Sequence, residues 1–313
     1  MKVFVAGATG AIGKRLVPLL VGAGHSVFAT TRTPGKRGML EAAGARALVL
    51  DALDRDAVMR AVAAAQPDVV VHQMTAIPDA VNPMKLDAQF ALTNRLRTEA
   101  AAHLLDAARA AGAAKLVAQS YAGFPNLRKG GPVTTEDDPF VANPPAAVRE
   151  TIEAIRILEW LVTTAGGITG IVLRYGSFYG AGTSLAREGR MTEMIRKRKV
   201  PTVGRGEGVW SFIHIDDAAA ATLAAIERGA AGIYNIVDDE PASIREWLPE
   251  AARILGARAP RRLPAWIARL VVGEGGVRMM EEARGASNAK AKRALGWQPR
   301  YGSWREGFRR EVA

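Results

Sequence analysis

The chain has 313 residues, of which 42 are basic and 31 are acidic, so its formal net charge is +11. It has no cysteine and only four histidines, which excludes disulfides and thiolate metal sites and leads us to expect no metal site. The basic residues are spread along the chain, and the one dense run, at 196–199, contains no aromatic residue. We therefore expect no nucleic-acid surface.

The sequence shows neither a membrane span nor a secretion signal. No apolar run is long enough to cross a bilayer, and the apolar start of the chain turns into glycines after a few residues. We expect a cytoplasmic protein that does not bind membranes and is a monomer or a homodimer.

The first fifteen residues carry the most informative pattern. An apolar run at 3–6 leads into GATGAIG at 7–13 and then into a helical pattern. This order predicts a strand, a glycine turn and a helix N-terminus, where backbone amides and the helix dipole hold a pyrophosphate. The alternative is a tight turn without a ligand. The residues expected to contact a dinucleotide here are Gly7, Thr9, Gly10, Ala11, Ile12 and Gly13.

The end of the second predicted strand indicates which dinucleotide is bound. An NAD site usually places Asp or Glu there, on the ribose 2′-hydroxyl. This chain has no acid at that point and instead carries Thr31, Arg32 and Lys36. A guanidinium and a hydroxyl suit a 2′-phosphate, so we predict NADP(H). The alternative is that Arg32 is a solvated loop residue.

The third predicted strand ends at Asp51. Its carboxylate is expected to accept a hydrogen bond from the adenine amino group, with Ala52 and Leu53 alongside the ring. The alternative role is that of an acid at the start of a helix near Asp54, and the two roles are compatible.

Strand and helix patterns alternate over the first half of the chain. Apolar runs predict strands at 2–6, 26–30, 47–50, 68–72, 115–119 and 169–174. Helical patterns lie at 12–21, 37–43, 55–64, 94–111 and 151–164. This alternation predicts an α/β fold, a Rossmann-like doubly wound parallel sheet covered on both faces.

The alternation stops after Arg174, and a smaller, mostly helical C-terminal lobe is expected to bind the substrate. We predict a cofactor domain from residues 1–175 plus about 211–240, and a substrate lobe from 176–210 plus 241–313. This region and its surroundings are rich in large aromatic residues, which favours a flat aromatic or polycyclic substrate. They include Phe124, Phe140, Trp160, Phe178, Trp210, Trp247 and Trp266.

Six short motifs, taken together, resemble the extended short-chain dehydrogenases/reductases, the superfamily of sugar-nucleotide epimerases and dehydratases. They are VAGATGAIG at 5–13, VVHQMTA at 70–76, LRYGSFYG at 173–180, SFIHIDDA at 211–218, YNI at 234–236 and ALGWQP at 294–299. The resemblance implies the fold and the cofactor, and it does not fix the reaction. By resemblance, Gln73, Met74, Gln119 and Tyr175 border the cofactor or the active cleft.

The catalytic pair of that superfamily, Tyr-x-x-x-Lys, is absent. None of the five tyrosines is followed by lysine four residues later. The family pattern places Thr151 and Ile155 at the two positions, and its Ser/Thr position falls at or beside Ser120 and Tyr121. The usual proton donor is therefore missing, and isoleucine cannot supply the charge of lysine.

Three explanations of this absence stay open. The chain could be an atypical NADPH-dependent ketoreductase whose substrate carbonyl needs little activation, similar to ketoreductases of aromatic polyketides. Tyr121 could instead donate the proton with help from Ser120, while Thr151 bonds a carbonyl, a ribose or its own helix terminus. The chain could also be a non-catalytic NADP-sensing regulator. A nucleotide-sugar epimerase or dehydratase is a further alternative, which the missing pair and Arg32 disfavour.

Overall fold

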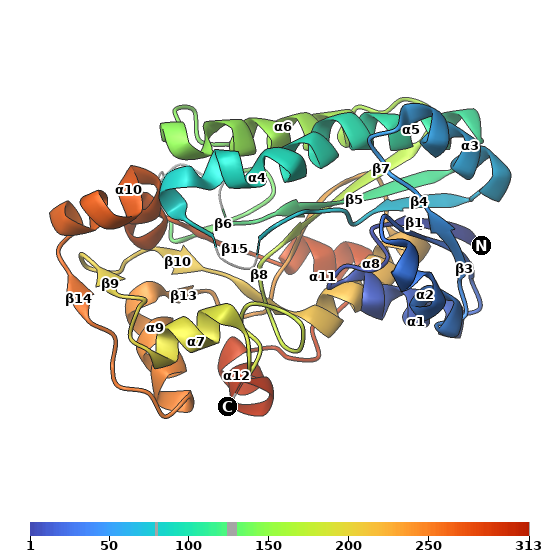
Figure 1. Cartoon of the computed structure of the whole chain (residues 1–313). Coiled ribbons are helices and arrows are strands. Elements are labelled where there is room, and N and C mark those ends of the chain that lie inside the picture. Colours follow the sequence, from blue (N-terminus) through green and yellow to red (C-terminus); the bar gives the residue numbers. More distant parts are fainter. Residues whose placement is uncertain (79–80, 124–129, 313) are drawn as a thin grey trace.

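The computed structural model describes residues 1–78, 81–123 and 130–312. Within these residues, seven parallel strands form a sheet in the order β12-β7-β5-β4-β1-β2-β3 (Figure 1). The α/β class and the doubly wound sheet predicted from the sequence are confirmed. The strands are β1 (Lys2–Ala6), β2 (Ser26–Thr31), β3 (Arg46–Val49), β4 (Val69–His72), β5 (Lys115–Tyr121), β7 (Thr169–Tyr175) and β12 (Gly232–Ile236).

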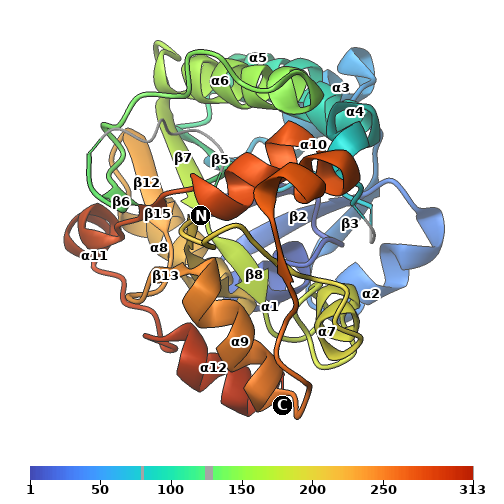
Figure 2. The same ribbon diagram turned by 90° about the vertical axis from the view of Figure 1, so that its left-hand side faces the viewer.

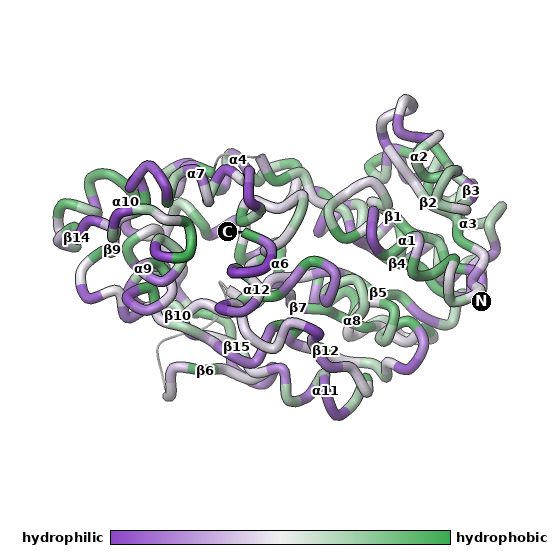
Figure 3. Tube along the Cα trace, turned by 90° about the horizontal axis from the view of Figure 1, so that it is seen from below, coloured by the Kyte–Doolittle hydropathy of each residue, from purple (hydrophilic) through white to green (hydrophobic). Residues whose placement is uncertain are grey.

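Helices cover both faces of the sheet (Figure 1). Alternate residues of β1 point to opposite faces, so Val3 and Val5 belong to one apolar core while Phe4 and Ala6 belong to the other. Hydrophobic residues predominate along α8, which packs on the first of these cores (Figure 3). One face carries α1 (Gly13–Gly22), α2 (Arg37–Ala42), α8 (Ile215–Arg228) and α11 (Ala289–Leu295). The other carries α3 (Arg55–Ala65), α4 (Leu86–Arg95), α5 (Ala101–Ala110) and α6 (Arg149–Thr163).

The helix expected at 94–111 differs from the prediction. It begins earlier, because Asn82 and Pro83 start a 3₁₀ turn (Pro83–Lys85) that leads into α4, with the Asn82 side chain accepting from the Met84 amide. A π-helical turn, Leu96–Ala100, then separates α4 from α5. Such turns are frequent at functional sites.

The part of the chain beyond β7 adds short strands and helices at one end of the sheet, as Figure 2 shows from that side. Its apolar core includes the fully buried Trp247, Trp304 and Phe212. Its helices are α7 (Arg190–Arg196), α9 (Ile244–Ile254), α10 (Ala265–Glu281) and α12 (Trp304–Glu311). The short strands are β8 (Ser177–Tyr179), β9 (Thr202–Val203), β10 (Val209–Trp210), β11 (Phe212–His214), β13 (Ala242–Ser243), β14 (Arg262–Leu263) and β15 (Gly285–Ala286). The last of them pairs with β6 (Val133–Thr134), which precedes β7 in the chain.

The described residues contain neither a membrane-spanning helix nor a cluster of metal-ligating side chains. None of their helices combines the length and the apolar character that a bilayer span requires. No group of three or more His, Asp or Glu side chains among them lies close enough together to hold a metal ion.

Candidate cofactor and substrate site

Packing alone requires two glycines of the turn after β1. Gly7 has a φ of +89°, and a Cβ at this position would lie 2.7 Å from the backbone of Gln73. A Cβ at Gly13 would lie 2.5 Å from the carbonyl oxygens of Gly7 and Ala8. These two glycines therefore let the turn pass close to the end of β4 and to the start of α1, with or without a ligand.

Gly10 differs, because it is exposed and a Cβ there would meet no protein atom closer than 3.4 Å. Beside it, the amide groups of Ala11 and Ile12 have no acceptor in the described part of the chain, and the first turn of α1 has no acidic side chain. The hydroxyl of Thr9 lies 3.5 Å from that of Thr31 at the same edge. Free backbone donors at a helix N-terminus, over an open glycine, fit the pyrophosphate of a dinucleotide.

The residues after β2 fit an additional phosphate. The hydroxyl of the buried Thr31 accepts from the Thr33 amide at 3.1 Å, which turns the chain outward. Arg32 and Lys36 are exposed there, and neither has an ion-pair partner within the described ranges. By contrast, the nearby Arg37 pairs with Glu41 at 2.7 Å. The structure therefore leaves Arg32 available for a 2′-phosphate.

We expect Arg32→Ala to weaken NADPH binding by about 10- to 100-fold, because charge-assisted hydrogen bonds to the 2′-phosphate are lost. NADH binding should change little, since its ribose has no phosphate. Calorimetric titration with each cofactor gives the ratio of the dissociation constants for NADH and NADPH. Arg37→Ala is the matched control and should have the same ratio as the wild type. Equal losses for both cofactors in Arg32→Ala would contradict the assignment.

Asp51 follows β3 and is exposed, with Ala52 buried and Leu53 half-buried beside it. One carboxylate oxygen of Asp51 accepts from the Leu53 amide at 3.0 Å. The cap of α3 is a different residue, Asp54, which accepts from the Ala57 amide at 3.0 Å. The helix-start role considered for Asp51 is thus filled by Asp54, and the adenine role stays a prediction.

The predicted residues Gln73, which follows β4, and Tyr175, which ends β7, belong to a buried network. The side-chain amide of Gln73 donates to the Tyr175 hydroxyl at 3.1 Å, and that hydroxyl lies 2.7 Å from the hydroxyl of Thr222. Burial raises the pKa of Tyr175 to about 12. The side-chain oxygen of Gln73, Oε1, is buried and has no partner in the described structure. It could accept from a cofactor hydroxyl. Met74, half-buried, donates its amide to the His72 ring.

The two positions on α6 where the family carries its Tyr-Lys pair are buried. Thr151 and Ile155 are both buried there. The Thr151 hydroxyl donates to the Asp87 carboxylate at 2.7 Å, and the Thr151 amide donates to the same oxygen at 2.9 Å. Asp87 thereby caps α6 from α4. Thr151 is anchored to this cap, and a catalytic role for it stays a prediction.

Ser120 belongs to a buried polar cluster at the carboxyl ends of β5 and β7. Its hydroxyl donates to Glu159 at 2.7 Å. Arg174 donates to both oxygens of Glu159, at 2.8 and 2.6 Å, and all three residues are buried. The Ser120 hydroxyl is thus bonded to Glu159, and a catalytic role for Ser120 stays a prediction. Gln119, one residue earlier, is half-buried and pairs in register with Leu173.

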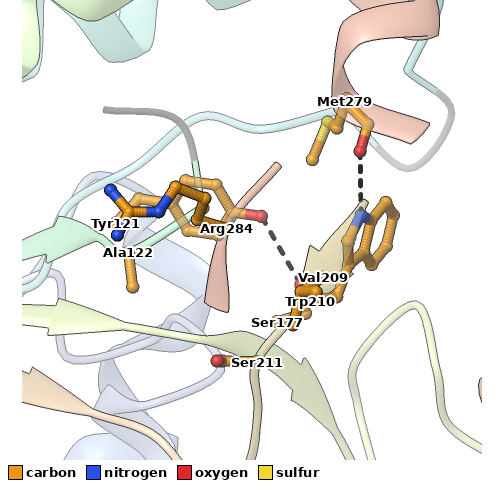
Figure 4. A pocket seen from close by; sticks show the side chains of 9 residues that line it. Tyr121, Ala122, Ser177, Val209, Trp210, Ser211, Met279 and Arg284 are labelled. Atoms are coloured by element: carbon orange, nitrogen blue, oxygen red, sulfur yellow. Dashed lines mark hydrogen bonds between the residues drawn. The ribbon is translucent and has the colours of Figure 1, made fainter. Parts of the chain in front are cut away.

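Tyr121 lies at a small pocket where β5 meets the C-terminal part of the chain (Figure 4). Its hydroxyl lies 3.4 Å from the Ser177 hydroxyl. Burial raises the pKa of Tyr121, so the phenol keeps its proton at neutral pH. The pocket is lined by Tyr121, Ala122, Gly123, Ser177, Val209, Trp210, Ser211, Met279 and Arg284.

The predicted aromatic residues lie in different environments: the pocket, the apolar core and the exposed surface. Trp210 lines the pocket, whereas Trp247 is fully buried in the core. Trp160 and Trp266 are 64% and 66% exposed. Phe124 lies outside the described residues. Only part of the aromatic content noted in the sequence therefore reaches this pocket.

Comparison with known proteins decides the family. The sequence profile described as the NAD dependent epimerase/dehydratase family matches residues 3–237. The chain belongs to this family. The resemblance to extended short-chain dehydrogenases/reductases noted in the sequence is thereby confirmed.

The curated relatives include proteins that are named as reductases. A 3-diazoavenalumate denitrifying reductase of a Streptomyces species is 46% identical over 99% of this chain and 100% of its own length. A 4-hydroxy-2-methyl-3-oxo-4-farnesyl-3,4-dihydroquinoline-1-oxide ketoreductase of Stigmatella aurantiaca is 28% identical over 83% of this chain and 75% of its own. Among solved structures, the human epimerase family protein SDR39U1 with NADPH has a TM-score of 0.73. It is 22% identical over 100% of this chain and 99% of its own, which shows a common fold.

Sequence reasoning missed several residues of the site. Asp87 and Glu159 bond to residues far away in the chain, and Arg97 is buried by tertiary packing, so their surroundings were not evident from the sequence. Trp210 and Arg284 were visible only as one aromatic and one basic residue among many. The signal that could have singled out Glu159 is its spacing, because Thr151, Ile155 and Glu159 lie four residues apart on one helix face.

Proposed function

We propose that the protein is an NADPH-dependent reductase that removes nitrogen from an aromatic diazo compound. The observation that carries the proposal is the burial of the two Tyr-Lys positions on α6. Thr151 is bonded to Asp87 there, and Ile155 is buried. A reaction that needs no proton donor suits such a site. The end-to-end similarity to a denitrifying reductase, at 46% identity, supports the same chemistry.

The chemical balance requires only a hydride. Bound NADPH supplies the hydride, and a diazonium group R–N₂⁺ becomes R–H and N₂. One C–N bond breaks, one C–H bond forms, and no external proton is consumed. The protein then has to hold the substrate next to the cofactor and exclude water, which is orientation rather than acid–base catalysis.

The placement of the two ligands follows the domain division proposed from the sequence. Residues 1–175 plus about 211–240 would hold the cofactor along the glycine turn and Arg32. Residues 176–210 plus 241–313 would cover the substrate. The pocket beside Tyr121 supports this arrangement, because Ser177, Trp210 and Arg284 reach it from the second set of residues.

A second candidate is the ketoreductase predicted from the sequence, which reduces a carbonyl of an aromatic substrate. Tyr121 favours it, because its phenol is protonated at neutral pH and lies at the pocket. The relative from Stigmatella aurantiaca is named a ketoreductase, at 28% identity. A nucleotide-sugar epimerase is disfavoured, because its chemistry depends most on the missing pair.

The test supplies 4-carboxybenzenediazonium, with ¹⁵N in the diazonium group, and NADPH deuterated at C4. We expect enzyme-dependent release of ¹⁵N₂ together with benzoate that carries deuterium at the former diazonium carbon. A reaction without protein corrects for spontaneous reduction, and 4-acetylbenzoate serves as the matched ketone. Deuterium transfer to the ketone alone would establish the ketoreductase. Firm NADPH binding without turnover of either compound would favour the regulator.

We expect Tyr121→Phe to separate the two reactions. Denitrification should keep its rate within a few-fold, because no proton is transferred to the substrate. Ketone reduction should fall by about 100-fold or more, as is typical when a general acid is removed. Single-turnover measurements with each substrate provide the comparison, with Tyr234→Phe as a control. A loss of about 100-fold in denitrification would contradict the proposed chemistry.

A further inference from the structure

The guanidinium group of Arg97 is buried. It lies in the π-helical turn Leu96–Ala100 and is 6% exposed. No hydrogen bond or ion pair of Arg97 is found among the described residues, and its Nη1 atom is buried and unpaired. Burial lowers the pKa of Arg97 to about 10, so the guanidinium stays charged at neutral pH.

The titratable neighbours of Arg97 do not neutralise it. Glu159 on α6 interacts with it at a distance, but both Glu159 oxygens are already taken by Arg174. His72 at the end of β4 is neutral, because burial and the charge of Arg97 lower its pKa to about 4. The buried cluster therefore has two positive charges, on Arg97 and Arg174, and one negative charge, on Glu159. An uncompensated buried charge of this kind is unfavourable and favours binding of an anion.

The position of Arg97 relates it to the missing pair. The π-helical turn packs against α6, the helix that carries Thr151 and Ile155 at the vacant positions. On the turn before Arg97, Asn94 donates to the Thr151 hydroxyl at 3.3 Å. The side-chain oxygen of Asn94, Oδ1, is also buried without a partner in the described structure. The turn that carries Arg97 is bonded to the carboxyl end of β4 through His72 and Leu96, and ligands bind at this edge in this type of sheet.

We propose that Arg97 binds a negatively charged oxygen of the substrate, a carboxylate or a phenolate, and holds it beside the nicotinamide. A guanidinium donates two parallel hydrogen bonds to such a group. The proposal rests on the proposed function only in placing a substrate at this edge of the sheet. It assigns Arg97 to binding and leaves the hydride chemistry unchanged.

The test uses the full chain saturated with NADP⁺ and three probes: 4-hydroxybenzoate, its methyl ester and 4-nitrophenolate. We expect the wild type to bind at least one of the two anions about 10- to 100-fold more tightly than the ester, by calorimetry. Arg97→Met should remove this preference, whereas NADP⁺ affinity should stay within a few-fold. The control Arg95→Met lies two residues away, is exposed and pairs with Glu99, and should keep the preference.

Each outcome decides a separate point. Tighter binding of 4-hydroxybenzoate identifies a carboxylate, and tighter binding of 4-nitrophenolate identifies a phenolate. Equal binding of anions and ester by the wild type, or a preference that survives in Arg97→Met, overturns the proposal. Loss of NADP⁺ binding in Arg97→Met also overturns it, because Arg97 would then hold the cofactor.

If Arg97→Met does not fold, Arg97→Lys, with its single point charge, should weaken the preference for the anion over the ester. An anion preference without any turnover would support the role of Arg97 and contradict the proposed function.

Discussion

Glu159→Ala should lower the free energy of unfolding by about 3–5 kcal/mol, the range found when one partner of a buried ion pair is removed. The side chains of Glu159 and Arg174 are each 4% exposed and form a two-pronged ion pair. Without Glu159, the guanidinium groups of Arg174 and Arg97 would share a buried site with no carboxylate. The Ser120 hydroxyl would also lose its acceptor. Urea unfolding at pH 7 measures the change.

A matched double variant separates the charge effect from the loss of packing. Glu159→Leu combined with Arg174→Met removes both charges of the pair and keeps most of the volume. We expect it to be more stable than Glu159→Ala, because replacement of a complete buried pair by apolar groups is often neutral. A Glu159→Ala protein with wild-type stability would show that the ion pair does not hold β5, β7 and α6 together.

His72 should make the protein less stable in acid, by about 3 kcal/mol between pH 7 and pH 4. Its ring donates to the Leu96 carbonyl at 2.8 Å and accepts from the Met74 amide, so it is held neutral. Its pKa is lowered to about 4. The unfolded chain takes up a proton near pH 6.5 and the folded chain does not. The contribution of His72 is therefore complete above pH 6.5 and is lost as the pH falls through 4.

The variant His72→Gln isolates this effect, because glutamine keeps a hydrogen-bond donor and does not titrate in this range. The difference in unfolding free energy between wild type and variant should shrink steadily from pH 7 to pH 4. Chemical unfolding at several pH values provides the measurement. Parallel pH curves for the two proteins would mean that folding does not lower the pKa of His72.

The alternation of apolar runs predicted the sheet well, because each buried parallel strand is nearly continuous in apolar residues. All six strands predicted in the first half of the chain form, and the glycine turn lies at the carboxyl end of β1. The start of α4 was missed because the signal is a short Asn82-Pro83 pair far from the strong apolar pattern. The paired two-residue strands of the C-terminal part depend on tertiary contacts that no local pattern reveals.

The candidate site was predictable only where a single segment carries it. The turn at 7–13 and the basic loop at Arg32 are local, so sequence alone indicated them. Ser120 illustrates the limit, because no local pattern shows that its hydroxyl is bound to Glu159, thirty-nine residues away. The burial of Arg97 likewise follows from the packing of three elements around it. Local sequence cannot show which partner a polar side chain meets.

The pocket beside Tyr121 combines short segments from β5, β8, β10 and the end of α10. The glycine turn and Arg32 lie on other strands and share no residue with it. Exchange of the segments around Trp210, Met279 and Arg284 between relatives should therefore change which substrate is accepted. The preference for one coenzyme should stay the same. Such independence gives the fold a simple route to accept new molecules without a change in its coenzyme.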